Sequence, residues 1–381
     1  MDPLTLNQNE SPLRIALACG GTGGHIFPGL ATAEVLRERG HEVHLWLAGK
    51  DVESEAVSGW DGPVHTVPSE GFMHGVSPRS LKTAWTLMGS ARKCVDLMRR
   101  NLPQVMLGMG SYASVGPAYA AMRLKIPVVL HEANVLPGRA IGLLSRWAVT
   151  VAGSFEETRF YLRGRPLVVT GMPMRRDLAE AAAQRRNGKR DPGQLTLLVM
   201  GGSRGAHALN QTVTRAVCEC HRLGHKFQVI HLTGRADEIT VRGDYRTHGV
   251  SAEVLAFTRD MAAIYAAADL AICRSGASTC AELSAFGVPA LLIPYPHAAN
   301  DHQTANARAM EKVGAADVVP EKDLSDDWLK DYIAQCILAP NRLERMSAAT
   351  RRRAAGQGAS ALADLVVEVG RREFEPMAVA Y

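Results

Sequence analysis

One arrangement occurs twice in this sequence: an apolar run of strand length passes directly into a cluster of glycines, and a helical pattern follows. The first copy has an apolar run at 13–19, glycines at 20–24 and a helix predicted over 28–39. The second begins about 180 residues later, with an apolar run at 195–200 and glycines from 201 onward. A buried strand, a glycine turn and a helix form the opening of a doubly wound α/β domain. Two such openings predict two domains.

Further apolar runs supply the remaining strands of both predicted sheets. They lie at 41–47, 105–107, 126–130, 149–151 and 167–169 in the first half, and at 227–232, 270–273 and 289–293 in the second. Helix-length segments separate them, which predicts parallel strands joined by right-handed crossovers. Ligands of such folds bind at the carboxyl ends of the strands. We therefore expect two Rossmann-like doubly wound domains facing a central cleft.

Glycine and proline at 171–173 mark the predicted joint between the domains. We expect the N-terminal domain over 13–172 and the C-terminal domain over 173–349. The stretch from 341 to about 372 has a helical pattern, and its part from about 350 to 372 is expected to pack back on the first domain.

Composition excludes several other classes of protein. The 381 residues are 46% hydrophobic and 21% charged, and no stretch approaches the roughly 18 consecutive apolar residues of a membrane-spanning helix. The N-terminus shows no signal-peptide pattern. Seven cysteines without a C-x-x-C pair predict neither a disulfide framework nor a zinc site, and they agree with a reducing cytoplasm.

The net charge of +5 is small, but its distribution along the chain is uneven. Residues 1–71 carry 4 basic and 10 acidic side chains, a net charge of −6. Residues 72–172 carry 13 basic and 4 acidic side chains, a net charge of +9. This second segment is the part of the chain that we expect to face an anionic partner.

Three glycine loops follow predicted strands and are candidates for ligand binding. The loop at 20–24 ends in His25 and precedes a helix whose N-terminal N–H groups suit an anion, but it lacks the Lys-Ser/Thr of a Walker A loop. The loop at 108–113 reads G-x-G-x-x-A, which fits a dinucleotide site with Glu132 as ribose reader and equally a site for another ligand. In the loop at 201–206, the Ser203 hydroxyl suits a diphosphate.

Two charged side chains stand near these loops. Glu282 falls in the first turns of a predicted helix, where a carboxylate either accepts hydrogen bonds from the vicinal hydroxyls of a ribose or only stabilises the helix dipole. Arg175 follows the joint and suits a diphosphate, or else is solvated surface. The chain has neither D-x-D nor H-E-x-x-H, so we expect no metal site and no cofactor.

Seven motifs in order resemble one family closely, from about residue 14 to about residue 365. They are GGTGGH at 20–25, GMGSYAS at 108–114, HEAN at 131–134, GMPMR at 171–175, GGSRGA at 201–206, RSGASTCAE at 274–282, and PYPH at 294–297 with DHQTANA at 301–307. The family is the bacterial undecaprenyldiphospho-muramoylpentapeptide N-acetylglucosaminyltransferases (MurG family). Met172 and Ala133 stand where the family commonly has Asn and Gln.

The resemblance implies a metal-independent, inverting glycosyltransferase of the GT-B fold. Its donor would be UDP-N-acetylglucosamine, and its acceptor the 4-hydroxyl of N-acetylmuramic acid in undecaprenyl-diphosphate-linked muramoyl-pentapeptide. His25 would be the catalytic base, with Glu132 as the competing base or as a group that orients it. Substrate contacts would come from Thr22, Gly23, Gly24, Asn134, Arg175, Ser203, Thr258, Ala277, Ser278, Thr279, Cys280, Ala281, Glu282 and Gln303.

The acceptor of this family is a membrane lipid, so a membrane-facing surface is expected within the +9 segment. Residues 71–88 mix apolar, aromatic and basic side chains, and the candidates for membrane contact are Val76, Arg79, Leu81, Lys82 and Trp85. The alternative is an amphipathic helix packed on the sheet. The resemblance places the protein peripherally on the cytoplasmic face of the bacterial plasma membrane. There it would act in peptidoglycan synthesis, cell shape and division, without nucleic acid, and contact with other cell-wall proteins is left open.

Three other functions compete with this interpretation. One is a GT-B transferase that uses a UDP-sugar and a different acceptor. A second, resting on the 108–113 loop alone, is a dinucleotide-dependent oxidoreductase. The third is a non-catalytic protein that binds a nucleotide sugar, and the presence of both His25 and Glu132 argues against it.

Overall fold

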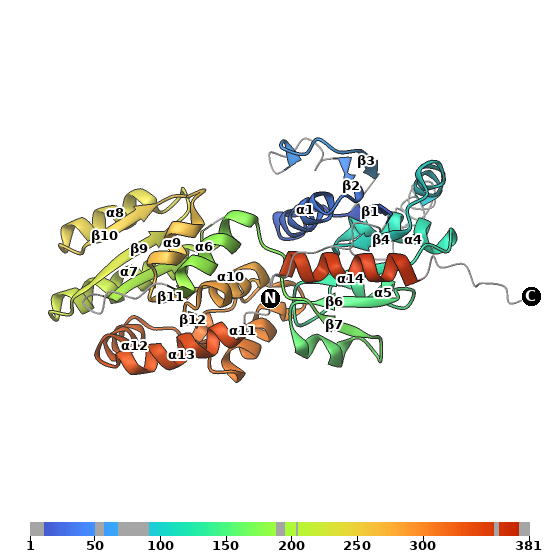
Figure 1. Ribbon diagram of the computed structural model, residues 1–381. Helices are drawn as coiled ribbons and strands as arrows, with labels where there is room; N and C mark the ends of the chain where they lie inside the picture. Colours follow the sequence, from blue (N-terminus) through green and yellow to red (C-terminus); the bar gives the residue numbers. More distant parts are fainter. Residues whose placement is uncertain are drawn as a thin grey trace, which may run out of the picture. The chain divides into compact units, whose positions relative to one another are not determined.

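The computed structural model of this chain describes residues 11–49, 57–67, 91–187, 195–202, 205–353 and 358–372. The chain forms two compact units. The first consists of Met1–Ala133, Pro137–Arg175 and Gly356–Tyr381, and the second of Asn134–Leu136 and Arg176–Ala355. Each unit has one parallel sheet with helices packed on it (Figure 1).

The sheet of the first unit has seven strands in the order β3-β2-β1-β4-β5-β6-β7. Their bounds are β1 (Arg14–Ala18), β2 (Glu42–Ala48), β3 (Val64–Val67), β4 (Val105–Gly108), β5 (Val128–Glu132), β6 (Thr150–Gly153) and β7 (Leu167–Val169). All pairs are parallel, and Leu17 of β1 lies in register with Leu45 and Leu107 on its two neighbours. These leucines are fully buried, as expected for a sheet covered by helices on both faces.

The helices of the first unit supply its two hydrophobic layers. They are α1 (Gly23–Glu38), a helix over residues 91–101, α4 (Val115–Arg123), α5 (Arg139–Leu144) and α14 (Gly358–Arg372), with short 3-10 turns η2 (Tyr112–Ser114) and η3 (Glu156–Tyr161). Leu362 and Val366 of α14 belong to the same apolar cluster as Ile15 and Leu36. Arg39 also forms an ion pair with Asp364 at 2.7 Å. The C-terminal helix is thus part of the N-terminal core.

The sheet of the second unit has six parallel strands in the order β10-β9-β8-β11-β12-β13. Their bounds are β8 (Leu195–Met200), β9 (Phe227–Leu232), β10 (Ala252–Leu255), β11 (Leu270–Cys273), β12 (Ala290–Leu292) and β13 (Ala316–Val318). The helices are α6 (Arg176–Asn187), α7 (His207–Arg222), α8 (Glu238–Thr247), α9 (Met261–Ala267), α10 (Ala277–Phe286), α11 (His302–Lys312), α12 (Asp326–Leu338) and α13 (Pro340–Arg353), with turns η4 (Ala299–Asp301) and η5 (Glu321–Asp323).

Two doubly wound parallel sheets confirm the predicted fold class, and a cleft shared by the domains stays a prediction. The structure differs from the sequence prediction mainly at short elements. Helix α1 begins at Gly23 rather than at Pro28, because the glycine loop itself enters the first helical turn. The strands β3, β10 and β13 were not expected. Each has three or four residues and is only partly buried, so its sequence lacks an apolar run.

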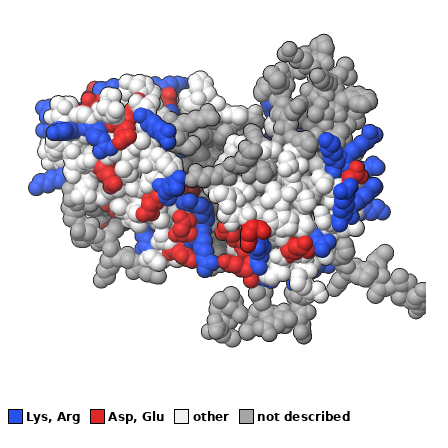
Figure 2. Space-filling view, turned by 90° about the horizontal axis from the view of Figure 1, so that it is seen from above, with Lys and Arg blue, Asp and Glu red and all other residues white. Residues whose placement is uncertain are grey.

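Charged side chains are distributed unevenly over the surface. Figure 2 shows a dense group of Lys and Arg side chains at the right of the face in view, and further basic side chains at its left and centre. The helix over 91–101 carries four exposed basic residues, Arg92, Lys93, Arg99 and Arg100. Among the described residues, no helix has both the length and the apolar character required to span a bilayer.

Candidate active site

His25 lies in the first turn of α1, where the glycine loop at 20–24 ends. Its Nδ1 is 2.9 Å from the carbonyl oxygen of Met109, which follows β4. A carbonyl only accepts hydrogen bonds, so Nδ1 carries the proton and Nε2 is the basic nitrogen of the ring. Burial lowers the pKa of His25 below its usual 6.5, more than the Met109 carbonyl raises it. The imidazole is therefore neutral at pH 7 and can accept a proton.

The turn after β4 is shaped around His25. A Cβ on Gly110, whose φ is +87°, would lie 3.3 Å from Cε1 of the imidazole. The neighbouring Ser111 also has a positive φ, of 59°, and its Oγ accepts from the N–H of Ala113. Ser114 Oγ donates to the carbonyl of Gly110 at 2.6 Å, which fixes the turn from beneath. The second glycine of the G-x-G-x-x-A loop is thus explained by the histidine packed on it, and a dinucleotide is not needed to account for it.

Glu132 is the last residue of β5 and is 4% exposed. Its Oε2 accepts from the N–H of Gly138 at 2.8 Å, so the carboxylate closes the loop at 133–138. The adjacent His131 is buried, and burial lowers its pKa to about 4, with the nearby His25 adding to the effect. Glu132 thus holds the 133–138 loop, and its role as base or as a group that orients His25 stays a prediction.

The remaining candidates of the first unit lie around the same loop. Thr22, Gly23 and Gly24 are exposed at the start of α1. The guanidinium carbon of Arg175 lies 6.0 Å from the centre of the Phe27 ring, at the outer limit of a cation–π contact. Arg175 is therefore placed beside α1 of the first unit.

In the second unit, the loop after β8 bends sharply toward β9. Gly202 and Gly205 have φ of +100° and +76°. A Cβ on Gly205 would lie 2.4 Å from the carbonyl oxygen of Thr233, so only glycine allows this approach. Asn210, on the first turn of α7, donates to the same carbonyl at 2.8 Å. The loop thus leads tightly into the α7 N-terminus, while Ser203 itself lies outside the described residues.

The segment at 277–282 forms the first six residues of α10. Its N-cap, Gly276, brings no side-chain hydrogen bond to the helix end, and Ala277, Ser278 and Thr279 are half-buried. These residues present an N-terminal helix turn, a favourable place for phosphate oxygens. Within this segment the Cys280 side chain is buried, and its N–H donates to Gly276 O at 2.9 Å. Contact of the segment with a diphosphate stays a prediction.

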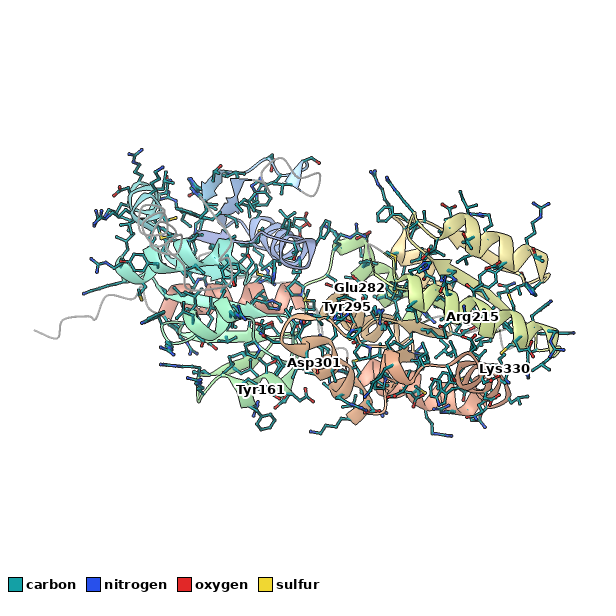
Figure 3. The ribbon with its side chains drawn as sticks, turned by 180° about the vertical axis from the view of Figure 1, so that it is seen from behind. Tyr161, Arg215, Glu282, Tyr295, Asp301 and Lys330 are labelled. Atoms are coloured by element: carbon teal, nitrogen blue, oxygen red, sulfur yellow. The ribbon has the colours of Figure 1, made fainter. Side chains whose placement is uncertain are left out.

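Glu282 lies on the second turn of α10, as predicted, and is half-buried. Its Oε2 accepts a hydrogen bond of 2.7 Å from the phenolic hydroxyl of Tyr265, on α9. Figure 3 labels Glu282 and Tyr295 at one end of the second unit, and Arg215 and Lys330 toward its other end.

Gln303 connects three segments of the second unit. Its Oε1 accepts from the N–H groups of Ser275 and Tyr295, at 3.3 and 3.0 Å. Its carbonyl accepts from Ser275 Oγ at 2.8 Å. Before α11, Asn300 and Asp301 both have φ of +53°. This turn brings the start of the helix onto the loop that follows β11.

The buried Asn306 holds the segment Asn134–Leu136, which belongs to this unit. Its Oδ1 accepts from the N–H of Val135 at 3.0 Å, and its Nδ2 donates to Asn134 Oδ1 and to Ser275 O at 3.0 and 3.1 Å. Asn134 is thereby brought beside the Ser275–Gln303 pair.

Thr258 lies before α9 and is half-buried. Its Oγ1 accepts from the N–H of Asp260 at 3.1 Å, and Asp260 in turn caps α9 through the N–H of Ala263. Thr258 thus lies just before the N-terminus of α9, the helix that contains Tyr265.

Sequence reasoning missed Tyr265 and assigned no role to Asn306. Tyr265 stands in an apolar helix pattern and has no motif. Asn306 lay within a quoted motif, but its partners Asn134 and Val135 are more than 170 residues away along the chain. The candidates for membrane contact, Val76, Arg79, Leu81, Lys82 and Trp85, lie outside the described residues.

Comparison with protein families identifies the class. The glycosyltransferase family 28 N-terminal domain matches residues 15–153, and the family 28 C-terminal domain matches residues 196–366. With two Rossmann-like domains and these matches, the protein is a family 28 glycosyltransferase of the GT-B fold. This decides against the oxidoreductase alternative.

Curated relatives narrow the family. The UDP-N-acetylglucosamine--N-acetylmuramyl-(pentapeptide) pyrophosphoryl-undecaprenol N-acetylglucosamine transferase of Anaeromyxobacter dehalogenans is 35% identical over 95% of this chain and 94% of its own. The enzyme of the same name from Syntrophotalea carbinolica is 37% identical over 94% of this chain and 98% of its own. The chain belongs to this transferase family, which confirms the resemblance seen in its motifs.

Solved structures agree with this assignment. The crystal structure of Acinetobacter baumannii MurG has a TM-score of 0.78 and 26% identity, and the match covers 94% of this chain and 100% of that chain. The glycosyltransferase of kitacinnamycin, at 16% identity and a TM-score of 0.67, shares the fold.

Proposed function

We propose that this protein transfers N-acetylglucosamine from UDP-N-acetylglucosamine to the 4-hydroxyl of N-acetylmuramoyl-pentapeptide linked to undecaprenyl diphosphate. The donor and the lipid-linked acceptor are those that appear in the names of its relatives. The observation that supports this chemistry is the neutral imidazole of His25. Its hydrogen bond to Met109 O keeps the ring proton on Nδ1. It leaves Nε2 to remove a proton from a hydroxyl.

In the proposed reaction, His25 Nε2 takes the proton of the acceptor hydroxyl while the oxygen of that hydroxyl attacks the anomeric carbon of N-acetylglucosamine. The bond from that carbon to the UDP oxygen breaks, and the configuration inverts. Glu132 keeps the 133–138 loop in place through the N–H of Gly138. General base catalysis of this type contributes about 10² to 10⁴ in rate.

The departing UDP carries growing negative charge, which the second unit is suited to stabilise. The N-termini of α7 and α10 supply N–H groups and positive helix ends. Glu282 would accept from the ribose hydroxyls, Thr258 would meet the uracil through its backbone, and Gln303 would read the sugar. Thr22, Gly23, Gly24, Asn134 and Arg175 complete the proposed substrate set.

We assign the acceptor and the membrane surface to an N-terminal domain of residues 13–172, completed by a helix at about 350–372, and the donor to residues 173–349. The +9 segment supports the membrane assignment, and the exposed basic residues of the helix over 91–101 belong to it. On this proposal the protein is peripheral to the cytoplasmic face of the plasma membrane, in contact with anionic lipid.

The direct test incubates the protein with radiolabelled UDP-N-acetylglucosamine and the lipid-linked muramoyl-pentapeptide, with a chelator in place of metal. Label should pass into the lipid product. Failure of transfer by protein that binds UDP would overturn the acceptor assignment, and transfer to a different acceptor would favour another UDP-sugar transferase.

The membrane assignment has its own test. Replacing Leu81 and Trp85 by serine should lower co-sedimentation with anionic liposomes several-fold, because it removes the apolar side chains proposed to insert. Turnover of a short-chain, soluble acceptor should persist. Unchanged liposome binding would instead support a helix packed on the sheet.

A further inference from the structure

The hydrogen bond between Tyr265 and Glu282 joins a fully buried hydroxyl to a half-buried carboxylate. The Tyr265 side chain is 1% exposed, and its hydroxyl lies 2.7 Å from Oε2 of Glu282. The Tyr265 ring packs against Phe286, one turn further along α10, with the ring centres 5.4 Å apart. Tyr265 therefore contacts α10 at two residues, through its hydroxyl at Glu282 and through its ring at Phe286.

The direction of this hydrogen bond is fixed by chemistry. Burial and the neighbouring carboxylate raise the pKa of Tyr265 well above 10, so the phenol stays protonated and donates. An ionised carboxylate has about four lone-pair positions. After accepting one hydrogen bond from the Tyr265 hydroxyl, Glu282 can still accept hydrogen bonds from ligand hydroxyls. The bond from Tyr265 also holds the plane of the carboxylate in place.

The elements that carry the pair also lead to the proposed uracil contact. Asp260 caps α9 through Ala263 N–H, and the N–H of Asp260 donates to Thr258 Oγ1. Four residues separate Asp260 from Tyr265. One short helix thus connects the residue proposed to meet the base with the residue that touches the ribose-binding carboxylate.

We infer that Tyr265 is a positioning residue that holds the Glu282 carboxylate against the ribose, and that it thereby sets a preference for uridine over 2′-deoxyuridine donors. The inference rests on the proposed function, since it takes Glu282 as the ribose contact. A merely structural tyrosine would affect stability or binding of both nucleotides equally. A positioning tyrosine acts through the ribose hydroxyls that the carboxylate accepts from, so its loss weakens UDP more than 2′-deoxy-UDP.

The test measures binding of UDP and of 2′-deoxy-UDP to the full chain by calorimetry. Wild-type protein should prefer UDP. In Tyr265→Phe, affinity for UDP should fall about tenfold, the loss expected when ligand hydroxyls make poorer hydrogen bonds to a charged carboxylate. Affinity for 2′-deoxy-UDP, which lacks one of these hydroxyls, should fall less. In turnover, the KM for UDP-N-acetylglucosamine should rise while kcat stays within about twofold.

Tyr245→Phe is the matched control. Tyr245 is another buried tyrosine of the same unit, and its hydroxyl lies 3.0 Å from His231 Nδ1 rather than at Glu282. Its variant should keep the preference for UDP. A loss of preference equal to that of Tyr265→Phe would show a general effect of loosening the core, and would overturn the inference.

Two unnatural side chains at position 265 keep the test decisive if the phenylalanine variant does not fold. 4-Fluorophenylalanine fills the space of the hydroxyl but donates no hydrogen bond, so this variant should lose the preference for UDP over 2′-deoxy-UDP. 4-Aminophenylalanine donates, and it should retain it. Equal preference in both would refute the role of Tyr265 and leave the proposed function standing. Wild-type protein that binds no UDP would contradict the proposed function itself.

Discussion

At the scale of single residues, the chemistry depends on how each group is held as much as on which group is present. His25 is directed by a backbone carbonyl, and Gly110 leaves the space that its ring occupies. Glu132 is engaged by Gly138, and Glu282 by Tyr265. In each case the partner lies on another element, so a change at the partner acts through position rather than through reacting atoms.

Removal of the proposed base gives the prediction at this scale. His25→Ala should lower kcat by about 10² or more, since general base catalysis is lost, while the affinity for UDP stays unchanged. His248→Ala is the matched control, because its Nδ1 also meets a backbone carbonyl, that of Asp244, and its ring is exposed. Steady-state rates and calorimetry measure both. Full turnover by His25→Ala would transfer the role of base to Glu132.

At the scale of elements, two glycines with a similar backbone conformation are packed very differently. Gly205 lies against the backbone that follows β9. Gly249, just after α8, has a similar φ of +71°, and a Cβ added there would have only His221 Nε2 nearby, at 3.7 Å. The same backbone conformation thus occurs once with room for a methyl group and once without.

This contrast predicts different outcomes for two alanine substitutions. Gly249→Ala should cost only the strain of a positive φ, about 1–2 kcal/mol. Gly205→Ala should cost more and should weaken UDP binding at least several-fold, because the loop must move away from Thr233. Denaturant unfolding and calorimetry check both. UDP affinity equal to wild type in Gly205→Ala would show that this loop does not hold the diphosphate.

The same elements show how far the sequence alone could predict the structure. The strands at 195–200, 227–232 and 270–273 match the prediction, because buried parallel strands leave continuous apolar runs. The strand at 167–169 also matches, although Val168 and Val169 are exposed. Glu282 on the second turn of α10 followed from local spacing. The burial of the Cys280 side chain did not follow from it, because the face of a helix that is buried depends on the elements packed against it. The roles of Tyr265 and Asn306 depend on contacts between separate elements, which no local pattern records.

At the scale of the whole molecule, each unit contains a buried histidine kept neutral by its surroundings. Burial lowers the pKa of His131 to about 4 and that of His231 to about 3, from 6.5. Between these values and 6.5, the unfolded chain binds protons that the folded chain does not. Stability therefore rises with pH across this window and falls as the pH is lowered through it.

We expect the melting temperature to fall steadily from pH 6.5 to pH 4, with a loss on the order of 3 kcal/mol per histidine. His231→Gln keeps an uncharged polar side chain at the site and should flatten this slope, whatever its effect at pH 7. Scanning calorimetry over the pH series measures it. An equal slope in the variant and the wild type would show that His231 does not contribute.

The position of α14 has a consequence for synthesis of the chain. Gly370 lies against Leu13 and Val105, and Leu362 and Val366 fill the core around β1. On the ribosome, the unit that begins first therefore lacks part of its interior until the last helix has emerged. The second unit, made in between, has its own apolar core and contains no part of α14. The order in which the units are completed is thus the reverse of the order in which they begin.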